Sequence, residues 1–310
     1  MIEKQQNEKE DKLTRARKYE QEKEEPQNAE NRPAFHVTPP VGWMNDPNGF
    51  SLYQGEYHLF YQYHPYSTQW GPMHWGHCKT KDFVKWEQLP CALAPDTDYD
   101  GQGCFSGSAV EHEGKHILMY TSVRELGTED GARVIRQTQS IAVGDGLNYT
   151  KIQQNPVITA DVLPEGSSSI DFRDPRIWKE GNTFYSCIGS RNADDSGQIA
   201  LFSSGDTETW KWEGIIDRCN NRYGKMWECP DFYPMGDKYV LMFSPMGSGD
   251  HTSVYLAGDF DYGTGTFSHY ISGEIDWGFD YYAPQSFLAP DGRRIIVAWA
   301  NEWEWMPLWK

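Results

Sequence analysis

Three acidic residues stand in short motifs that are far apart in the chain. Asp46 lies in "WMNDPNG", Asp174 in "DFRDP" and Glu228 in "WECPD". Carboxylates brought into one pocket repel one another and raise at least one pKa, so such a cluster is costly as pure structure. Two carboxylates facing one bound sugar are what glycoside hydrolysis needs, one as nucleophile and one as acid/base. The motifs therefore predict a carboxylate active site, provided that the fold brings them together.

Each acidic residue also has a purely structural interpretation. Asp46 opens Asp-Pro-Asn-Gly, a common turn sequence in which Asp and Asn bond their own backbone, Pro fixes φ and Gly accepts positive φ. Asp174 has Arg173 and Arg176 close by for a salt bridge, and Glu228 can be a solvated strand end. The active-site interpretation is favoured over these alternatives if a repeat along the chain brings the three residues together.

Two neighbours of the carboxylates have expected roles. Arg173 precedes Asp174 and offers a planar donor fork, which we expect to keep that carboxylate ionised. Cys229 follows Glu228 as a small polarisable neighbour, which is consistent with tuning an acid of high pKa.

The elements that must position these residues are strands. From residue 34 onward, short apolar and aromatic runs such as "GEYHLFYQYHP", "KHILMYTSV" and "KYVLMFSP" alternate with Gly, Asp, Asn and Pro. No convincing amphipathic helix of ten or more residues follows residue 34. The sequence predicts an all-β chain.

A longer repeat predicts how the strands are grouped. The copies "HCKTKDFVKW" (77–86) and "FSSGDTETWKW" (202–212), with a weaker third at 141–151, read as the outer strands of a sheet. Each is preceded by a motif that begins a new sheet, with steps of 60, 68, 54 and 54 residues between the five motifs. The repeat predicts a five-bladed β-propeller over residues 34–310, whose innermost strands converge on one end of a central channel. The five blade-start residues are Asp46, Ser106, Asp174, Glu228 and Tyr282.

Residues 1–33 have a different composition. They are charged and nearly free of apolar residues, but Leu13, Ala16 and Tyr19 recur at helical spacing and Pro26 ends the pattern. We expect a charged, partly helical leader, and a disordered leader is the alternative.

Composition limits the classes of partner. The formal charge of the 310 residues is 28 − 45 = −17, which disfavours nucleic acid and anionic membrane as partners. Aromatic residues make up 15% of the chain, with 13 Trp and 18 Tyr. Aromatic faces stack on the C–H faces of sugars, so this enrichment favours a small-molecule saccharide partner. A homo-oligomer is left open.

No metal or cofactor is expected. The six cysteines have irregular spacing, and no His completes a metal site. His74 and His77 are better explained as core histidines than as a metal pair, and Trp70, Trp75 and Phe105 can be plain core as well. No apolar run is long enough to span a membrane, and the first residues, "MIEKQQNEKEDK", have no apolar signal-peptide region. These features predict a cytoplasmic protein with reduced thiols.

The ordered motifs "WMNDPNG", "FYQYHP", "WGPMHWGH", "FSGSA", "FRDP" and "ECPD" resemble those of glycoside hydrolase family 32, from about residue 34 to residue 300. That family contains invertases, sucrose-6-phosphate hydrolases and fructan hydrolases, and its fold is a five-bladed propeller followed by a β-sandwich. The resemblance implies a retaining β-fructofuranosidase without cofactor. It makes Asp46 the nucleophile, Glu228 the acid/base and Asp174 the carboxylate that binds fructose hydroxyls and stabilises the transition state. The implied substrate-binding residues are Trp43, Asn45, Gln62, Trp70, Phe105, Ser106, Arg173 and Trp299.

The chain departs from the family pattern at its end. It stops at "WANEWEWMPLWK", so the β-sandwich is absent and the fifth blade is expected to lack a final strand. We favour a fragment as the explanation over a natural short form that pairs with a partner, or a leader that covers the gap.

Substrate and reaction type stay open within the family. The choice lies among sucrose, sucrose 6-phosphate and short fructo-oligosaccharides, and a 6-phosphate would need basic residues near the leaving group. A transfructosylase uses the same residues. A non-catalytic sugar-binding propeller and related arabinose- or xylose-acting propellers are the other classes. The candidate basic residues are Arg124, Arg133, Arg136 and Lys225.

Overall fold

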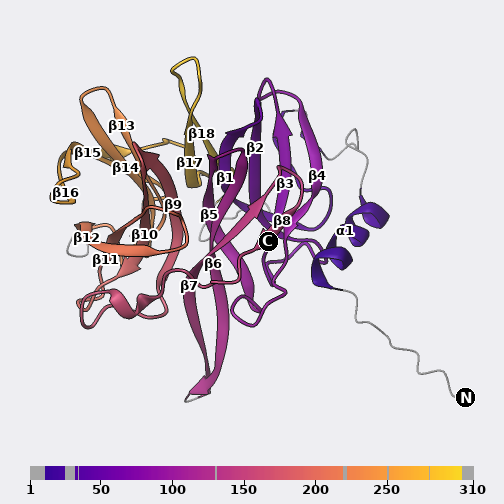
Figure 1. Ribbon diagram of the computed structural model, residues 1–310, viewed down its shortest axis with the longest axis horizontal. Coiled ribbons are helices and arrows are strands. Elements are labelled where there is room, and N and C mark those ends of the chain that lie inside the picture. Colours follow the sequence, from indigo (N-terminus) through magenta and orange to yellow (C-terminus); the bar gives the residue numbers. More distant parts are fainter. Residues whose placement is uncertain are drawn as a thin grey trace, which may run out of the picture.

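The chain folds into antiparallel sheets arranged around a common axis (Figure 1). The computed structural model describes residues 11–24, 32–33, 35–129, 131–218, 222–249, 251–278 and 280–301. The first sheet contains β1 (Trp43–Tyr53), β2 (Glu56–His64), β3 (His74–Thr80) and β4 (Trp86–Leu93). The second contains β5 (Gly103–His112), β6 (Lys115–Glu129), β7 (Ala132–Gly144) and β8 (Tyr149–Lys151). A short 3-10 turn, η1 (Ala160–Val162), follows.

The second half of the chain repeats this arrangement. The third sheet contains β9 (Phe172–Glu180), β10 (Thr183–Arg191), β11 (Gly197–Ser204) and β12 (Trp210–Arg218). The fourth contains β13 (Met226–Met235), β14 (Lys238–Met246), β15 (Val254–Asp261) and β16 (Thr266–Glu274). The last sheet pairs β17 (Tyr282–Leu288) with β18 (Arg294–Trp299). Each four-stranded sheet is a meander in which every strand pairs with the next one along the chain.

Tight turns explain why the strands pair with their sequence neighbours. Gln54 and Gly55 connect β1 to β2 with φ of 50° and 81°, and Glu113 and Gly114 connect β5 to β6 with φ of 51° and 74°. Two-residue loops with positive φ at both positions match the twist of the flanking strands. Such hairpins fix the register of the sheet from its innermost strand outward.

The innermost strands form a closed ring. Each of β1, β5, β9 and β13 contacts the next, and β17 contacts both β13 and β1. Gln285 on β17 accepts from the N–H of Phe50 at 2.7 Å and donates to the carbonyl of Gly107 at 3.0 Å, so one side chain joins β17 to two other sheets. The all-β propeller expected from the sequence is confirmed.

The number of blades differs from the prediction. The described residues form four four-stranded blades and one two-stranded sheet, so the prediction of five blades is wrong. The repeat correctly marks a fifth innermost strand at Tyr282, but β17 and β18 are the strands described after that point, and residues 302–310 lie outside the described residues.

A buried cluster of histidines joins the first two blades. His58 Nδ1 lies 2.9 Å from His77 Nε2, and His116 lies 2.9 Å from Ser51 Oγ and 2.8 Å from the hydroxyl of Tyr149. Burial lowers the pKa of His58 to about 4 and that of His116 to about 3. Within the described part of the chain, no three His, Cys, Asp or Glu side chains are placed to hold a metal ion.

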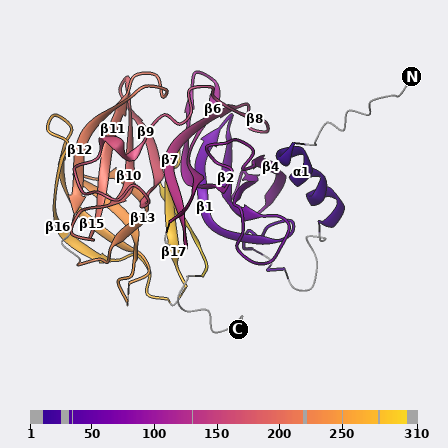
Figure 2. The same cartoon turned by 90° about the horizontal axis from the view of Figure 1, so that it is seen from below.

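The helix α1 (Lys12–Lys23) lies against the outer side of the first blade (Figure 2). Asp11 caps it by accepting from the N–H of Thr14 at 2.8 Å. Arg17 donates to the carbonyl of Cys91 on the edge strand β4, and Glu20 accepts from the N–H of the same residue. The helix therefore satisfies peptide groups that an edge strand would otherwise leave unpaired. None of the described helices has the length and apolar character to cross a membrane.

Candidate active site

Every innermost strand carries a break in register at or beside a residue that lines one common cavity. The breaks lie between Met44 and Pro47 in β1, Phe105 and Gly107 in β5, Arg173 and Arg176 in β9, Glu228 and Asp231 in β13, and Tyr282 and Gln285 in β17. A β-bulge bends the strand and redirects the side chains beside it. The five blade-start residues predicted from sequence therefore lie at or beside five equivalent bulges.

The local sequence explains these bulges. Asp174, Cys229 and Ala283 have φ of 67°, 49° and 53°, and each is followed by a proline. Proline donates no hydrogen bond to a sheet and is tolerated at bulges. A left-handed backbone at non-glycine residues costs about 1–3 kcal/mol each and concentrates at functional sites. The strained residues are Asp174, which lines the cavity, and Cys229 and Ala283, which directly follow the lining residues Glu228 and Tyr282.

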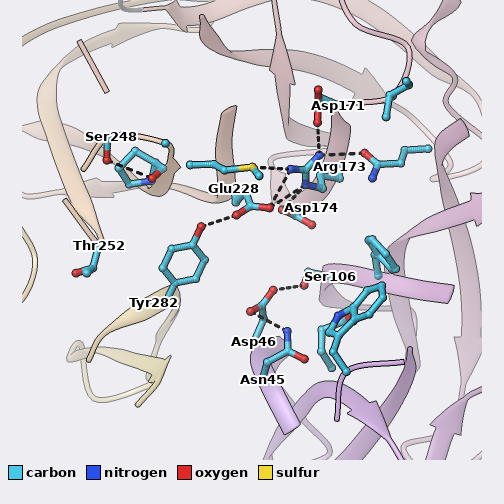
Figure 3. A pocket seen from close by; sticks show the side chains of 18 of the residues that line it. Asn45, Asp46, Ser106, Asp171, Arg173, Asp174, Glu228, Ser248, Thr252 and Tyr282 are labelled. Carbon is cyan, nitrogen blue, oxygen red and sulfur yellow. Dashed lines mark hydrogen bonds and ion pairs between the residues drawn. The ribbon is translucent and has the colours of Figure 1, made fainter. Parts of the chain in front are cut away.

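These bulges surround a cavity of about 410 Å³. Asp46, Asp174 and Glu228 all line it, together with Arg173 (Figure 3). The three carboxylates thus come from three different blades, β1, β9 and β13.

The two carboxylate oxygens of Asp46 accept hydrogen bonds from different groups. Asn45 Nδ2 donates to Oδ1 at 3.1 Å, whereas Ser106 Oγ donates to Oδ2 at 2.7 Å and the thiol of Cys229 lies 3.6 Å from the same oxygen. Burial raises the pKa of Asp46, and the nearby charge of Glu228 acts in the same direction. Ser106 and Asn45 oppose that shift by stabilising the carboxylate.

Glu228 is fixed by two partners from neighbouring blades. Arg173 donates to its Oε1 from Nε at 3.0 Å and from Nη2 at 2.9 Å, and Tyr282 donates to its Oε2. Arg173 is itself oriented by Asp171, whose Oδ1 lies 2.9 Å from Nη1. This chain of contacts holds one carboxylate in a single orientation.

Asp174 is the least exposed of the three carboxylates. Its backbone N–H donates to Thr121 Oγ1 at 2.8 Å, and its Oδ2 accepts from the N–H of Cys229 at 3.0 Å. Burial raises the pKa of Asp174 to about 7, although the positive charge of Arg173 acts in the opposite direction. The cavity therefore holds two carboxylates, those of Asp46 and Asp174, whose pKa is raised by burial.

Two details differ from the sequence-based expectations. The fork of Arg173 points to Glu228 and Asp171, while its Nε lies 4.0 Å from Asp174. Burial outweighs the arginine, so the pKa of Asp174 is raised rather than held low. The thiol of Cys229 contacts Asp46 instead of Glu228, because successive residues at the bulge face different neighbours.

Most of the predicted substrate-binding residues line the cavity, and two do not. Trp43 and Trp299 pack on each other with ring centroids 6.1 Å apart, and Trp43 Nε1 donates to Asn45 Oδ1 at 2.8 Å. These two rings support a residue of the wall and are not among the residues lining the cavity. Trp75 is fully buried in the core between the first two blades. The predicted residues that do line the cavity are Asn45, Gln62, Trp70, Phe105, Ser106 and Arg173.

Other lining residues were missed by sequence reasoning. Asp171 stands two positions before Arg173, and this spacing on a strand is a signal that places both side chains on one face. Tyr282 was recognised as a blade start without a role in the site. The loop of residues 245–252 carried no recognisable motif.

The fold and the site define a class: an all-β propeller whose cavity is lined by the carboxylates of Asp46, Asp171, Asp174 and Glu228 together with Arg173. Residues 36–307 match the family model of the glycosyl hydrolases family 32 N-terminal domain. The chain belongs to glycosyl hydrolase family 32.

Curated relatives agree with this assignment. The chain is 40% identical over 286 residues to a sucrose-6-phosphate hydrolase of Escherichia coli and 42% identical over 281 residues to a raffinose invertase of the same species. Each alignment covers 88% of this chain, and 57% and 58% of the two relatives. The chain therefore spans a little over half the length of these proteins.

Solved structures show the same fold. The family 32 β-fructofuranosidase of Bombyx mori superimposes with a TM-score of 0.85 at 38% identity, over 96% of this chain and 63% of that one. Fructan 1-exohydrolase IIa of Cichorium intybus gives a TM-score of 0.72 at 29% identity, over 87% of this chain and 53% of that one.

Proposed function

We propose that this chain carries the active site of a retaining β-fructofuranosidase. The substrates are sucrose, sucrose 6-phosphate or short fructo-oligosaccharides with a terminal β-fructofuranosyl unit. The observation that carries the proposal is the meeting of Asp46, Asp174 and Glu228, from three blades, in one cavity. Membership of family 32 and the names of the relatives support the same activity.

In the first step, Asp46 is the nucleophile. Ser106 and Cys229 contact Oδ2, so Oδ1, which has the single contact with Asn45, is the less committed oxygen. It attacks C2 of the fructosyl unit, the bond from C2 to the leaving oxygen breaks, and Glu228 transfers its proton to that oxygen. The products are a fructosyl ester of Asp46 and the free leaving group.

In the second step, water resolves the ester. Glu228, now a carboxylate, takes a proton from the water, whose oxygen attacks C2 and releases Asp46. Two displacements at the same carbon retain the anomeric configuration. Asp174 binds fructose hydroxyls and stabilises the charge on the sugar ring in the transition state, and Trp70 and Phe105 provide an aromatic wall.

The organisation of the chain enters the proposal as well. We assign residues 34–310 to the catalytic propeller and residues 1–33 to a leader whose helix α1 packs on the first blade. A cytoplasmic location is supported by the described cysteines, which are all free thiols.

The test is fructose release from sucrose, sucrose 6-phosphate and 1-kestose by the 310-residue chain. Asp46→Asn is expected to lower kcat by at least about 10⁴-fold, because it removes the nucleophile. Asp291→Asn is the matched control on an exposed turn. Proton NMR of the first product is expected to show the β-anomer of fructose. A chain that melts cooperatively, binds fructosides and releases no fructose would instead be a sugar-binding propeller.

A further inference from the structure

The loop of residues 65–73, between β2 and β3, carries one aromatic wall of the cavity. This wall is Trp70, which lines the cavity, is 50% exposed and meets Phe105 edge to face with ring centroids 6.0 Å apart. The preceding residues 67–69 are exposed as well. The place of the indole ring therefore depends on the contacts that hold the rest of the loop.

Two histidines hold the ends of this loop together. His64 is the last residue of β2 and His74 the first of β3, and both donate from Nδ1 to the carbonyl of Pro72, at 3.3 Å and 2.9 Å. Gly71 packs against the ring of His64 so closely that a Cβ would lie 2.7 Å from it. The backbone that directly follows Trp70 is therefore packed against one of these rings.

Tyr66 links the loop to the helix α1. Its ring meets the rings of His64 and His74 edge to face, with centroids 5.8 Å apart in both pairs. Two residues of α1 contact the same ring: Tyr19 meets it edge to face at 5.1 Å, and the guanidinium of Arg15 lies 5.0 Å from its centroid. Both kinds of contact are favourable in this geometry. Tyr66 thus contacts the helix and both ends of the loop.

The helix itself is anchored independently of this contact. Ala16 is fully buried in a core cluster that includes residues of all four strands of the first blade. Arg17 and Glu20 bind the peptide groups of Cys91 on β4. Because these contacts fix α1 on the blade, the helix offers a firm support to whatever packs against it. The helix precedes residues 36–307, the part of the chain that matches the family model.

Covering the edge strand does not explain the contacts to Tyr66. Arg17 and Glu20 satisfy the peptide groups of β4, whereas Tyr66 belongs to the loop after β2. The helix therefore makes a second set of contacts, and these reach the loop that carries a wall of the cavity.

We propose that Tyr19 and Arg15 are positioning residues, which hold Tyr66 and, through the loop, the indole of Trp70 in the place where it packs on the bound sugar. The inference rests on the proposed function and deepens it, because it adds a helix outside the family-matched residues to the support of the sugar-binding site. Neither Tyr19 nor Arg15 lines the cavity, so their effect is on substrate binding and not on the chemical step.

The first experiment compares kcat and KM in the wild type, Tyr19→Ala and Tyr19→Phe, on the fructoside that the chain cleaves fastest. Tyr19→Ala is expected to raise KM about fivefold with little change in kcat, because one ring pair is lost. Tyr19→Phe keeps the ring and is expected to restore most of the wild-type KM. Lys18→Ala, at an exposed position of the same helix, is the matched control. A Tyr19→Ala variant with a lower melting temperature and an unchanged KM would overturn the proposal.

A double-mutant cycle tests the route through Trp70. In the Trp70→Ala background, Tyr19→Ala is expected to change kcat/KM by less than about twofold, because the ring that it positions is gone. A full fivefold effect in that background would show that the helix acts on another part of the site, and would overturn the proposal.

A spectroscopic measurement separates this inference from the proposed function. The protein is labelled with fluorotryptophan, and the fluorine resonance of Trp70 is assigned with Trp70→Phe. Tyr19→Ala is expected to shift or broaden this resonance, and Lys18→Ala to leave it unchanged. Arg15→Met changes an exposed residue and is expected to act in the same direction, which keeps the test open if Tyr19→Ala does not fold.

The outcomes are distinct. A resonance that shifts in a protein that releases no fructose supports the positioning contacts while the proposed function fails. A resonance that is unchanged in both Tyr19→Ala and Arg15→Met overturns the inference while the fructosidase activity stands.

Discussion

Arg173 places two of its N–H groups on the same carboxylate oxygen of Glu228, at 3.0 Å from Nε and 2.9 Å from Nη2. The remaining nitrogen of the guanidinium, Nη1, donates to Oδ1 of Asp171 at 2.9 Å. One planar group thus sets the orientation of the proposed acid/base by contacts that a point charge does not reproduce.

Arg173→Lys is therefore expected to lower kcat/KM about 100-fold, in the range seen when a positioned donor of an active site is lost. The ammonium of lysine does not bridge Glu228 and Asp171 at once. Steady-state kinetics on sucrose measure the effect, and Arg293→Lys at an exposed position is the control. Activity within about twofold of wild type would show that the geometry of the guanidinium does not matter.

The pH dependence of activity follows from the buried carboxylates. The proposed mechanism needs Asp46 and Asp174 ionised, and burial raises the pKa of both, that of Asp174 to about 7. The acidic limb of the kcat/KM profile is expected near pH 7 instead of near pH 4, the ordinary value for Asp. Asp174→Asn should move the limb of the residual activity to lower pH. A wild-type limb that already lies below about pH 5 would contradict the raised pKa.

The histidine cluster predicts loss of stability in acid. Because the pKa of His58 is about 4 when folded and 6.5 when unfolded, its contribution is complete above pH 6.5 and is lost as the pH falls through 4. The loss for this residue alone is about 3 kcal/mol. Urea unfolding between pH 7 and pH 4 should show a smaller pH slope for His58→Gln than for wild type. The exposed His36→Gln is the control, and identical slopes for all three proteins would refute the assignment.

The buried side chain of Glu20 predicts that stability is lost at high pH rather than in acid. The side chain is 7% exposed, and burial raises its pKa from 4.5 to about 7. Its contribution is complete below pH 4.5 and is lost as the pH rises through 7. Glu20→Gln is expected to stabilise the protein by up to about 3 kcal/mol at pH 8 and to have little effect at pH 4.5. Melting curves test this, with Glu22→Gln at an exposed position of α1 as control. A variant that destabilises equally at both pH values would point to a packing role instead.

Much of the architecture could be predicted because strands and tight turns are determined by short stretches of sequence. Strand-length apolar runs and Gly-containing turns identify the meanders, and the repeated motif starts identify five innermost strands from Asp46 to Tyr282. The blade count failed because a motif marks the beginning of a sheet but not the number of strands that follow it. After Tyr282 the described chain provides two.

The sequence predicted which acidic residues belong to the candidate site, but not which side chains contact one another there. Motifs located Asp46, Asp174 and Glu228, whereas the partner of Arg173 depends on how β9 and β13 pack across the ring. Sequence adjacency suggested Asp174, but adjacent residues at a bulge face different neighbours. Trp43 and Trp299 illustrate the same limit. The sequence does not show whether an aromatic side chain lines the cavity or packs behind a residue that does.

The bulge repeated in every innermost strand bears on how such a site changes over evolution. Each strand contributes its own component to the same cavity, a carboxylate from β1, a hydroxyl from β5 and another carboxylate from β9. The strands belong to separate sheets, so a substitution at one bulge alters one component while the backbones of the other sheets stay in place. The propeller is modular in its chemistry as well as in its architecture, and new specificities are accessible one blade at a time.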